Sequence, residues 1–394
     1  MLPSYYEFYS PVKIISGMKA LDNLPYELEQ LGASRPLIVS DRGVSDAGLV
    51  EFVIDAFSES AVSIGAVFDA VPPDSSLQAV REAAVAFRAN GCDSIVAVGG
   101  GSVIDTAKGA NIVITEKSDD LARFAGAELL KKPMKPLVVI PTTAGTGSEV
   151  TLVTVIKDTA RNVKMAFTSY HLMPKAAILD PRMTLTLPPR ITAATAMDAL
   201  THAIEAYICL QKNPVSDAFA FSAIELIRDN LIYVVKEGKN PEGRLALLNA
   251  ACLAGIAFSN SMVGMVHALG HACGGVAGIA HGVAMSIFLP HGLEYNRHKA
   301  GDRIARLLLP LAGPRVFAQT PPEEMISQSI SEIRRLQEEL HRLTGLPRTL
   351  KEAGVAPDRL EQIAETAIGD GSVVFNPEEM DRDDALKVLQ KAYQ

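Results

Sequence analysis

The chain has 394 residues, a length that predicts about two domains. Hydrophobic residues make up 48% of it and charged residues 21%, the composition of a globular protein with enough apolar side chains for a buried core. The net charge of −8, without a basic run or a basic-aromatic stripe, argues against nucleic-acid binding and favours solubility.

The cysteines and the N-terminus bear on the compartment. No CxxC pair is formed by Cys92, Cys209, Cys252 and Cys273, and most of them lie in apolar surroundings, as buried reduced thiols do. The N-terminal stretch MLPSYYEFYSPVKI lacks the basic region and the apolar run of a signal peptide. We therefore expect a cytoplasmic protein.

The first half of the chain alternates short apolar runs with a helical pattern. The runs at 36–39, 94–98, 136–140 and 176–179 are brief, rich in β-branched residues and closed by Gly, Pro, Ser or Asp. Residues 77–91, LQAVREAAVAFRANG, carry apolar residues at helical spacing and end on a glycine. Strands alternating with helices predict a mostly parallel sheet, where ligands gather at the carboxyl ends of the strands.

A glycine-rich loop follows the second of these strands. Residues 96–109, VAVGGGSVIDTAKG, run from the strand through three glycines into a helix. Glycines let the backbone approach a phosphate, and a helix N-terminus offers free N–H groups. Ile104 occupies the place of the last glycine of GxGxxG, so the motif is incomplete. A phosphate-binding loop is the favoured interpretation, and a plain tight turn is the alternative.

Two further turns at strand ends have polar side chains. The turn at 141–149, PTTAGTGSE, supplies hydroxyls that line the same crevice or belong to a solvated loop; they are those of Thr142, Thr143, Thr146 and Ser148. Asp41 follows the strand at 36–39, where a carboxylate binds a ribose 2′-hydroxyl and repels a 2′-phosphate. It therefore favours NAD over NADP, unless it is an ordinary helix cap.

From about residue 188 the sequence becomes helical. Residues 191–208, 219–238 and 330–345 have helical spacing and composition, and LPPR at 187–190 breaks the preceding pattern. Between Arg244 and Glu294 there is no charged residue, but polar residues and glycines interrupt every apolar run of the ~18 residues that a membrane helix needs. We expect helices buried on all sides within a second domain.

Six of the eight histidines lie between residues 202 and 298. Asp198 and His202 are four residues apart on one helix face, and His267 and His271 repeat that spacing before His281. Buried imidazoles need partners, so they either form ordinary hydrogen bonds or share a metal ion. Imidazoles with one carboxylate suit Fe(II) or Zn(II), although spacing alone does not select the four ligands.

Four long motifs in order closely resemble the iron-containing (group III) alcohol dehydrogenase family. They are GGGSVIDTAK, PTTAGTGSE, MDALTHAIEAY and GMVHALGHACGG…HGVAMSIFLPH, and the likeness extends to NPEEMDRDDALKVLQKAY near the C-terminus. The resemblance implies an architecture like that of dehydroquinate synthase. Residues 1–188 would form a Rossmann-like α/β dinucleotide-binding domain and residues 189–394 an all-α metal-binding domain, with the active site in the cleft between them.

The resemblance also implies the site residues. The implied metal ligands are Asp198, His202, His267 and His281. The implied contacts of the cofactor are Asp41, Gly100, Gly101, Ser102, Asp105, Thr142, Thr143 and Lys164. His271 lies about 6 Å along the helix axis from His267, at ~1.5 Å per residue, so it is expected beside the nicotinamide and substrate. There it is a catalytic proton relay, and a structural hydrogen-bonded histidine is the alternative.

Two positions depart from the family pattern. Many members carry asparagine in a PNP motif before the glycine-rich loop, where this chain has Pro73 in PPDS. Some have another asparagine after the TTAGT segment, where Val153 stands here. Both departures put individual NAD hydrogen bonds in doubt, but not the cofactor itself.

The implied activity is hydride transfer between a primary alcohol, or the aldehyde in reverse, and NAD. A divalent ion, expected to be Fe²⁺ with Zn²⁺ as the alternative, stabilises the alkoxide, and the cofactor accepts the hydride. The other readings are a zinc-dependent relative such as glycerol dehydrogenase, another polyol or hydroxy-acid dehydrogenase, a lyase such as dehydroquinate synthase, and a binding protein without catalysis. We expect a small alcohol or aldehyde as the partner, no nucleic acid or membrane, and a homodimer or larger homo-oligomer.

Overall fold

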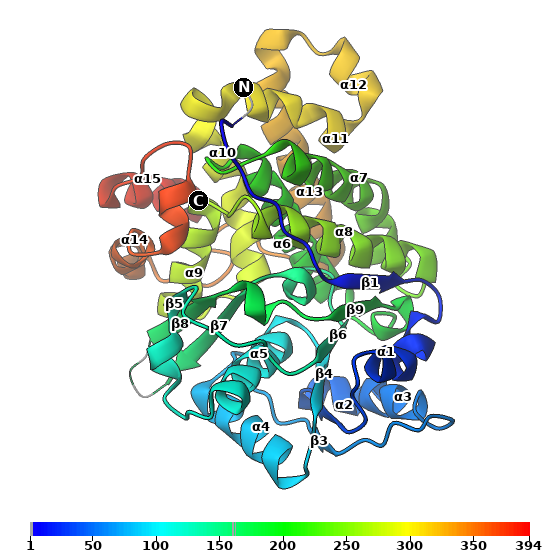
Figure 1. Cartoon of the computed structure of the whole chain (residues 1–394). Helices are drawn as coiled ribbons and strands as arrows, with labels where there is room; N and C mark the ends of the chain where they lie inside the picture. The colour runs from blue at the N-terminus through cyan, green and yellow to red at the C-terminus, as the bar shows by residue number, and fades with distance from the viewer. Residues whose placement is uncertain (1–2, 160, 162) are drawn as a thin grey trace. The chain divides into compact units, whose positions relative to one another are not determined.

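The computed structural model describes residues 3–159, 161 and 163–394 (Figure 1). The chain divides into two compact units, which we call the α/β unit (residues 10–186) and the helical unit (residues 187–394 with the N-terminal segment up to Tyr9). The α/β unit ends two residues before the boundary expected at 188. The N-terminal residues differ from the expectation, because they pack with the helical unit.

The main sheet of the α/β unit has six strands in the order β1-β9-β6-β4-β2-β3, and all neighbouring pairs are parallel. The strands are β1 (Lys13–Ser16), β2 (Pro36–Val39), β3 (Ala66–Phe68), β4 (Ser94–Gly99), β6 (Leu137–Pro141) and β9 (Ala176–Leu179). The four central strands are the apolar runs of the sequence, so the predicted parallel sheet is confirmed. The edge strands β1 and β3 were not predicted.

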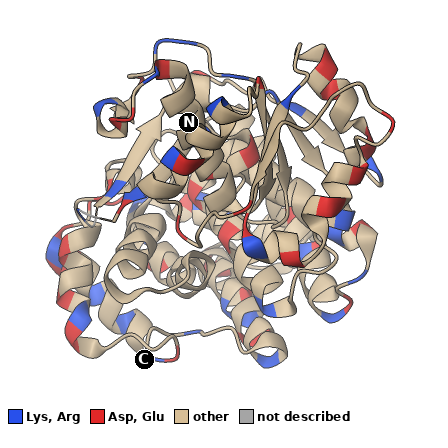
Figure 2. Cartoon of the chain, turned by 90° about the horizontal axis from the view of Figure 1, so that it is seen from below, with Lys and Arg blue, Asp and Glu red and all other residues tan. Residues whose placement is uncertain are grey.

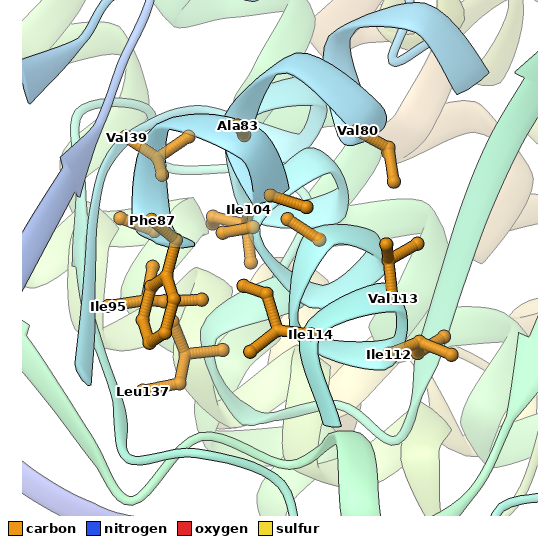
Figure 3. Packing of buried hydrophobic residues seen from close by; sticks show 14 of the residues in the cluster. Val39, Val80, Ala83, Phe87, Ile95, Ile104, Ile112, Val113, Ile114 and Leu137 are labelled. Atoms are coloured by element: carbon orange, nitrogen blue, oxygen red, sulfur yellow. The ribbon is translucent and has the colours of Figure 1, made fainter. Parts of the chain in front are cut away.

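Both faces of this sheet are buried, which explains why its central strands are apolar without alternation. Successive residues of β4 point to opposite faces: Ile95 joins one core cluster and Val96 the other. The first cluster lies under α4 (Leu77–Ala89) and α5 (Gly101–Glu116), where Phe87 and Ile104 pack against the strands (Figure 3). The second cluster lies under α1 (Leu24–Gln30) and α3 (Leu49–Asp55). The short helix α2 (Arg42–Asp46) follows β2.

A second, three-stranded sheet completes the α/β unit and was not predicted. It contains β5 (Gly126–Ala127), β7 (Val153–Asp158) and β8 (Val163–Thr168), in the order β5-β8-β7. Strands β7 and β8 are antiparallel and β5 is parallel to β8. Val153, one of the two departures from the family pattern, begins β7.

The helical unit has no strand among its described residues. Its helices are α6 (Pro189–Ile208), α7 (Pro214–Lys236), α8 (Pro241–Ser259), α9 (Met265–Ala277), α10 (His281–Arg306), α11 (Leu308–Ala312), α12 (Pro314–Gln319), α13 (Met325–Thr344), α14 (Leu360–Ala367) and α15 (Arg382–Tyr393). Local sequence determines where some of these helices begin. The side chains of Asn213 and Asn240 accept N–H groups at the N-termini of α7 and α8, and each asparagine is followed by a proline at the first helical position. The helical second half is confirmed.

The N-terminal segment is held by contacts with the helices. The ring of Phe8 stacks on that of Phe219 of α7, with centroids 5.6 Å apart. The backbone N–H of Tyr9 donates to Oδ1 of Asn260 at 2.7 Å. The helical unit is therefore built from two separate stretches of sequence.

The long uncharged stretch forms α8, α9 and the start of α10, most of whose residues are buried. Among the described residues, we find no helix that is both long and apolar enough to span a membrane. Acidic and basic residues are scattered over the helices and loops in Figure 2, in keeping with the mixed charge of the sequence. All four cysteines are buried.

Candidate functional site

Three helices of the helical unit bring four of the predicted site residues together. Asp198 and His202 lie one turn apart on α6, His267 lies in the first turn of α9, and His281 begins α10. One ligand atom from each of the four lies within 4.8 Å of the other three, and His271 is not part of this group. Asp198, His202 and His267 are buried and His281 is partly exposed.

A glycine allows α10 to approach α6 at this point. A Cβ atom on Gly282 would lie 2.3 Å from the backbone oxygen of Ala194, closer than two such atoms can come. Ala194 is one helical turn before Asp198, and Gly282 directly follows His281. This close approach therefore places the imidazole of His281 beside the carboxylate of Asp198.

Asp198 is the centre of the cluster. Its Oδ1 atom lies 3.2 Å from Nε2 of His281, 3.8 Å from Nδ1 of His202 and 3.9 Å from Nε2 of His267. The His202 ring stacks against Phe258, with centroids 4.3 Å apart, and lies 4.5 Å from the His267 ring. The rings are thus held by packing, with their nitrogens directed to one point.

Three of these ligand atoms are buried and form no hydrogen bond of good geometry with the described residues: Oδ1 of Asp198, despite its 3.2 Å approach to His281, Nδ1 of His202 and Nε2 of His267. Leaving a buried polar atom unsatisfied costs about 1–3 kcal/mol, so three together need an explanation. A divalent cation gives all three one partner. Three imidazoles and one carboxylate fit Fe(II) or Zn(II), and they do not fit the hard ions that take oxygen ligands.

The electrostatics of the cluster agree with this assignment. Burial by itself raises the pKa of Asp198, but the neighbouring imidazoles of His202, His281 and His267 bring it below its ordinary value. Burial also lowers the pKa of His202 to about 3, so this imidazole is neutral at physiological pH. An ionised carboxylate and a neutral imidazole are the forms that bind a metal.

His271 lies at the edge of the cluster. Its ring centroid is 5.8 Å from that of His267 and 5.3 Å from that of His281. Its side chain is 39% exposed, and its Nδ1 atom is 2.8 Å from Oδ2 of Asp370. The hydrogen bond to His271 lowers the pKa of Asp370 below its usual range, although burial opposes this. His271 is thus tethered beside the four ligands and remains in contact with solvent.

Two acidic residues of this region were missed in the sequence. Glu205 is buried on α6 and approaches Nδ1 of His267. Its signal was present, because it follows His202 by three residues and Asp198 by seven, on the same helix face. Asp370 is 99 residues from His271 in the chain, and no sequence pattern connects the two.

In the α/β unit, the loops after β4 and β6 meet. A Cβ atom on Gly100 would lie 3.2 Å from Oγ1 of Thr143, and one on Gly101 would lie 2.9 Å from Cγ2 of Thr146. Helix α5 begins at Gly101, so its first N–H groups have no acceptor within the helix. The two predicted cofactor loops thus form one backbone cradle at the carboxyl ends of neighbouring strands, the arrangement that fits a phosphate group.

The turn at 72–75 contacts two of the predicted cofactor residues. The hydroxyl of Ser102 donates to the backbone oxygen of Pro73, where many family members carry asparagine. Asp74 lies 3.8 Å from Nζ of Lys157 and 3.8 Å from Nζ of Lys164. The proline therefore leaves the turn connected to the glycine loop through its backbone.

Asp41 caps α2, because its Oδ1 atom accepts the N–H of Val44 at 2.9 Å. Asp41 thus acts as a helix cap at the carboxyl end of β2, and its contact with a ribose stays a prediction. Thr142, also predicted to contact cofactor, is buried directly after β6 and its N–H donates to the oxygen of Gly99 at 3.1 Å.

Asp105 belongs to a buried network beneath the cradle. Its carboxylate accepts from the hydroxyl of Ser148 and the N–H of Val155, both at 3.3 Å. Nζ of Lys108 donates to the backbone oxygens of Thr151 at 2.8 Å and Val153 at 2.9 Å. Burial lowers the pKa of Lys108 to about 8, which its attraction to Asp105 opposes. Asp105 thus supports the loop that carries Ser148.

Comparison with known proteins identifies the family of the chain. Residues 11–181 match the family model described as iron-containing alcohol dehydrogenase, and residues 192–393 match that of the Fe-containing alcohol dehydrogenase family, C-terminal. A 1,3-propanediol dehydrogenase of Klebsiella pneumoniae is 35% identical over 98% of this chain and 99% of its own. An NAD-dependent methanol dehydrogenase of Bacillus methanolicus is 34% identical over 98% of this chain and 99% of its own.

The crystal structure of a 1,3-propanediol oxidoreductase superposes with a TM-score of 0.94, at 35% identity over 99% of this chain and 100% of that one. The chain belongs to the iron-containing alcohol dehydrogenase family of NAD-linked alcohol oxidoreductases.

Proposed function

We propose that this chain oxidises small primary alcohols to aldehydes with NAD, and catalyses the reverse reduction, at a divalent metal centre. Asp198, His202, His267 and His281 would hold the metal, and Fe²⁺ is its proposed occupant. The observation that carries the proposal is the set of buried ligand atoms without hydrogen-bond partners. The family membership, with relatives named for 1,3-propanediol and methanol, supports the substrate class.

The bound groups and the protein would divide the chemistry between them. A metal in this donor set supplies Lewis acidity that lowers the pKa of an alcohol, and NAD supplies the hydride acceptor. The four ligand side chains are held by helix packing, so they would need little rearrangement to bind a metal. The ligating carboxylate also makes the site less positive than three imidazoles alone.

His271 is the proposed proton relay. Its Nδ1–H donates to Asp370, so Nε2 has the lone pair that takes the proton leaving the alcohol. A partly exposed imidazole passes that proton on to solvent. Asp370 would keep the ring oriented and stabilise it while it is protonated.

The glycine cradle is the proposed pyrophosphate site. Gly100, Gly101 and Ser102 would present backbone N–H groups at the start of α5, with Thr142 and Thr143 alongside. Asp41 would contact the adenine ribose and Lys164 the cofactor, while Asp105 would support the cradle from beneath. These roles come from the motif match and from the meeting of the two loops.

The test is a substrate panel on protein reconstituted separately with iron and zinc. Ethanol, butanol, 1,3-propanediol and glycerol are offered with NAD, and NADH formation is followed by its absorbance. Turnover of primary alcohols, highest with iron, is the expected result. Turnover confined to glycerol with zinc would favour a glycerol dehydrogenase instead, and no turnover at all would contradict the proposal.

A further inference from the structure

Glu205 is a buried acid that the proposed chemistry does not use. It lies on α6, three residues after His202, and is 1% exposed. A buried carboxylate needs hydrogen-bond donors or a positive partner. Its donors come from α9, and they connect the packing of this helix to one of the proposed metal ligands.

The backbone donors of Glu205 are the N–H groups at the start of α9. Its Oε1 atom accepts the N–H of Val266 at 2.8 Å, and the N–H groups of Gly264 and His267 also point to the carboxylate. The remaining N–H of this turn, from Met265, donates to Oδ1 of Asn376 at 3.2 Å. The first turn of α9 is thus capped by side chains from other elements, and a negative charge at this end suits the helix dipole.

The other oxygen of the same carboxylate holds the side chain of His267. Oε2 lies 2.5 Å from Nδ1 of this imidazole. In its ionised form a carboxylate only accepts hydrogen bonds, so Nδ1 then carries the hydrogen. A neutral imidazole has a single N–H, and Nε2 is then left with its lone pair. Nε2 is the atom that lies 3.9 Å from Oδ1 of Asp198 without a hydrogen-bond partner.

We propose that Glu205 is a positioning residue that fixes His267 in its Nδ1–H tautomer and directs the Nε2 lone pair at the metal site. The inference rests on the proposed function for the metal, but the tautomer itself does not depend on metal being bound. Because the backbone of α9 holds Glu205 in place, the imidazole is set before a metal arrives. Such partners of metal-binding histidines also raise the basicity of the ligand nitrogen.

Glutamine is the informative replacement, because an amide has one acceptor oxygen and one donor nitrogen. If the oxygen of Glu205→Gln stays on the N–H groups of α9, the NH₂ group faces His267 and donates to Nδ1. The imidazole hydrogen then moves to Nε2, where it blocks the metal. If the amide is flipped, its NH₂ group faces the N–H groups of α9, and two donors cannot form a hydrogen bond with each other. Glutamine therefore cannot satisfy both sets of contacts.

The first experiment records ¹⁵N–¹H spectra of the histidine rings in metal-free protein at mildly alkaline pH, where imidazoles are neutral. Comparison with His267→Ala assigns the His267 signals. The expected result is the Nδ1–H form in the wild type and the Nε2–H form in Glu205→Gln. An Nε2–H form of His267 in the wild type would overturn the proposal, whether or not the variant folds.

The second experiment measures metal affinity by competition with a chelator. Glu205→Gln is expected to bind Zn²⁺ and Fe²⁺ about 10–100-fold more weakly than wild type, the usual effect of removing such a partner. Glu205→Asp keeps a carboxylate and should recover part of the affinity. The matched control is Glu27→Gln in the α/β unit, which removes another buried carboxylate, paired with Lys13, and should leave metal affinity unchanged.

The outcomes separate this inference from the proposed function. Wild-type affinity in a folded Glu205→Gln variant would overturn the role of Glu205 and leave the four ligands in place. A wild-type protein that binds no metal would contradict the proposed function, while the ring spectra would still decide the tautomer.

Discussion

The two units each bury a cluster of charged and polar side chains, and the clusters differ in how their atoms are satisfied. In the α/β unit, Nζ of Lys108 donates to the backbone oxygens of Thr151 and Val153, and Asp105 accepts from two neighbours. In the helical unit, three ligand atoms around Asp198 have no hydrogen-bond partner among the described residues. Burial of charge is common to both, so it does not mark a binding site. Single buried atoms without a partner also occur elsewhere, as at Thr106 and Ser286, so the site is marked by three such ligand atoms gathered at one point.

The largest expected effect is at the unsatisfied cluster. His267→Ala removes one of the four proposed ligands and also the ring that packs against a second ligand, His202, so we expect it to abolish both metal content and turnover. Metal analysis of the purified variant and NADH formation are the measurements. Full occupancy in His267→Ala, or in the companion variant His281→Ala, would rule out the assignment.

The hydrogen-bonded cluster around Lys108 and Asp105 should behave in the opposite way, because a change there should lower stability and leave metal content unchanged. Lys108→Met leaves the buried backbone oxygens of Thr151 and Val153 without their donor, and each unsatisfied buried group costs about 1–3 kcal/mol. We expect that loss in the free energy of unfolding, measured in denaturant, with metal content retained. A Lys108→Met protein that is as stable as wild type but has lost its metal would contradict the structural role of this cluster.

His271→Ala tests the edge of the metal cluster. Because His271 is not among the four ligands, the variant should keep its metal and lose roughly 10- to 1000-fold in turnover at neutral pH, the scale of general acid–base catalysis. Metal content and rate are measured on the same preparation. Metal loss would make His271 a ligand, and unchanged kinetics would make it structural.

Gly282→Ala tests the helix packing that brings the ligands together. The added methyl group would collide with the backbone of Ala194, so α10 must shift, at a cost of about 1–3 kcal/mol in stability. Metal affinity should fall as His281 moves away from Asp198. Gly275→Ala in α9 is the matched control, because its methyl group meets no atom within 4 Å, and it should be at least as stable as wild type. Equal behaviour of the two variants would contradict this role for the close approach.

The smallest expected effect concerns the choice of cofactor. Asn in place of Asp41 keeps the cap on α2 and removes the charge, so a change in cofactor preference is separated from a change in stability. The preference for NAD over NADP should fall about fivefold, corresponding to ~1 kcal/mol between two charges near 4 Å apart in water. Comparison of kcat/KM for the two cofactors is the measurement. A wild type that uses NADP as well as NAD would remove this role from Asp41.

Much of the fold could be predicted from the sequence, because local patterns of apolar and polar residues determine the strands and helices. The central strands are continuous apolar runs and α6 has helical spacing, so both could be predicted. The edge strand β1 was missed, since KIIS is short and its residues are mostly exposed, without the apolar pattern of a buried strand. The β7–β8 pair was missed for a related reason, because strand pairing is decided by contacts with other parts of the chain.

Some residues of the candidate site could likewise be predicted from the sequence, and others could not. The histidine clustering and the motif match pointed to the four residues that the structure brings within 4.8 Å, although no spacing rule joins α6 to α10. That junction depends on Gly282 against Ala194, which only the packed helices reveal. Glu205 could have been found from its place on the helix face, whereas Asp370 could not.

The N-terminal segment has a consequence for how the chain is made. Tyr9 finds its partner Asn260 251 residues later, so at about 5–20 residues per second a ribosome needs on the order of ten to fifty seconds to complete the pair. During that interval the whole α/β unit leaves the exit tunnel as one uninterrupted stretch. The helices against which residues 3–9 pack have not yet been synthesised. Synthesis thus gives the α/β unit a head start, and the N-terminal segment packs only after α7 and α8 have been made.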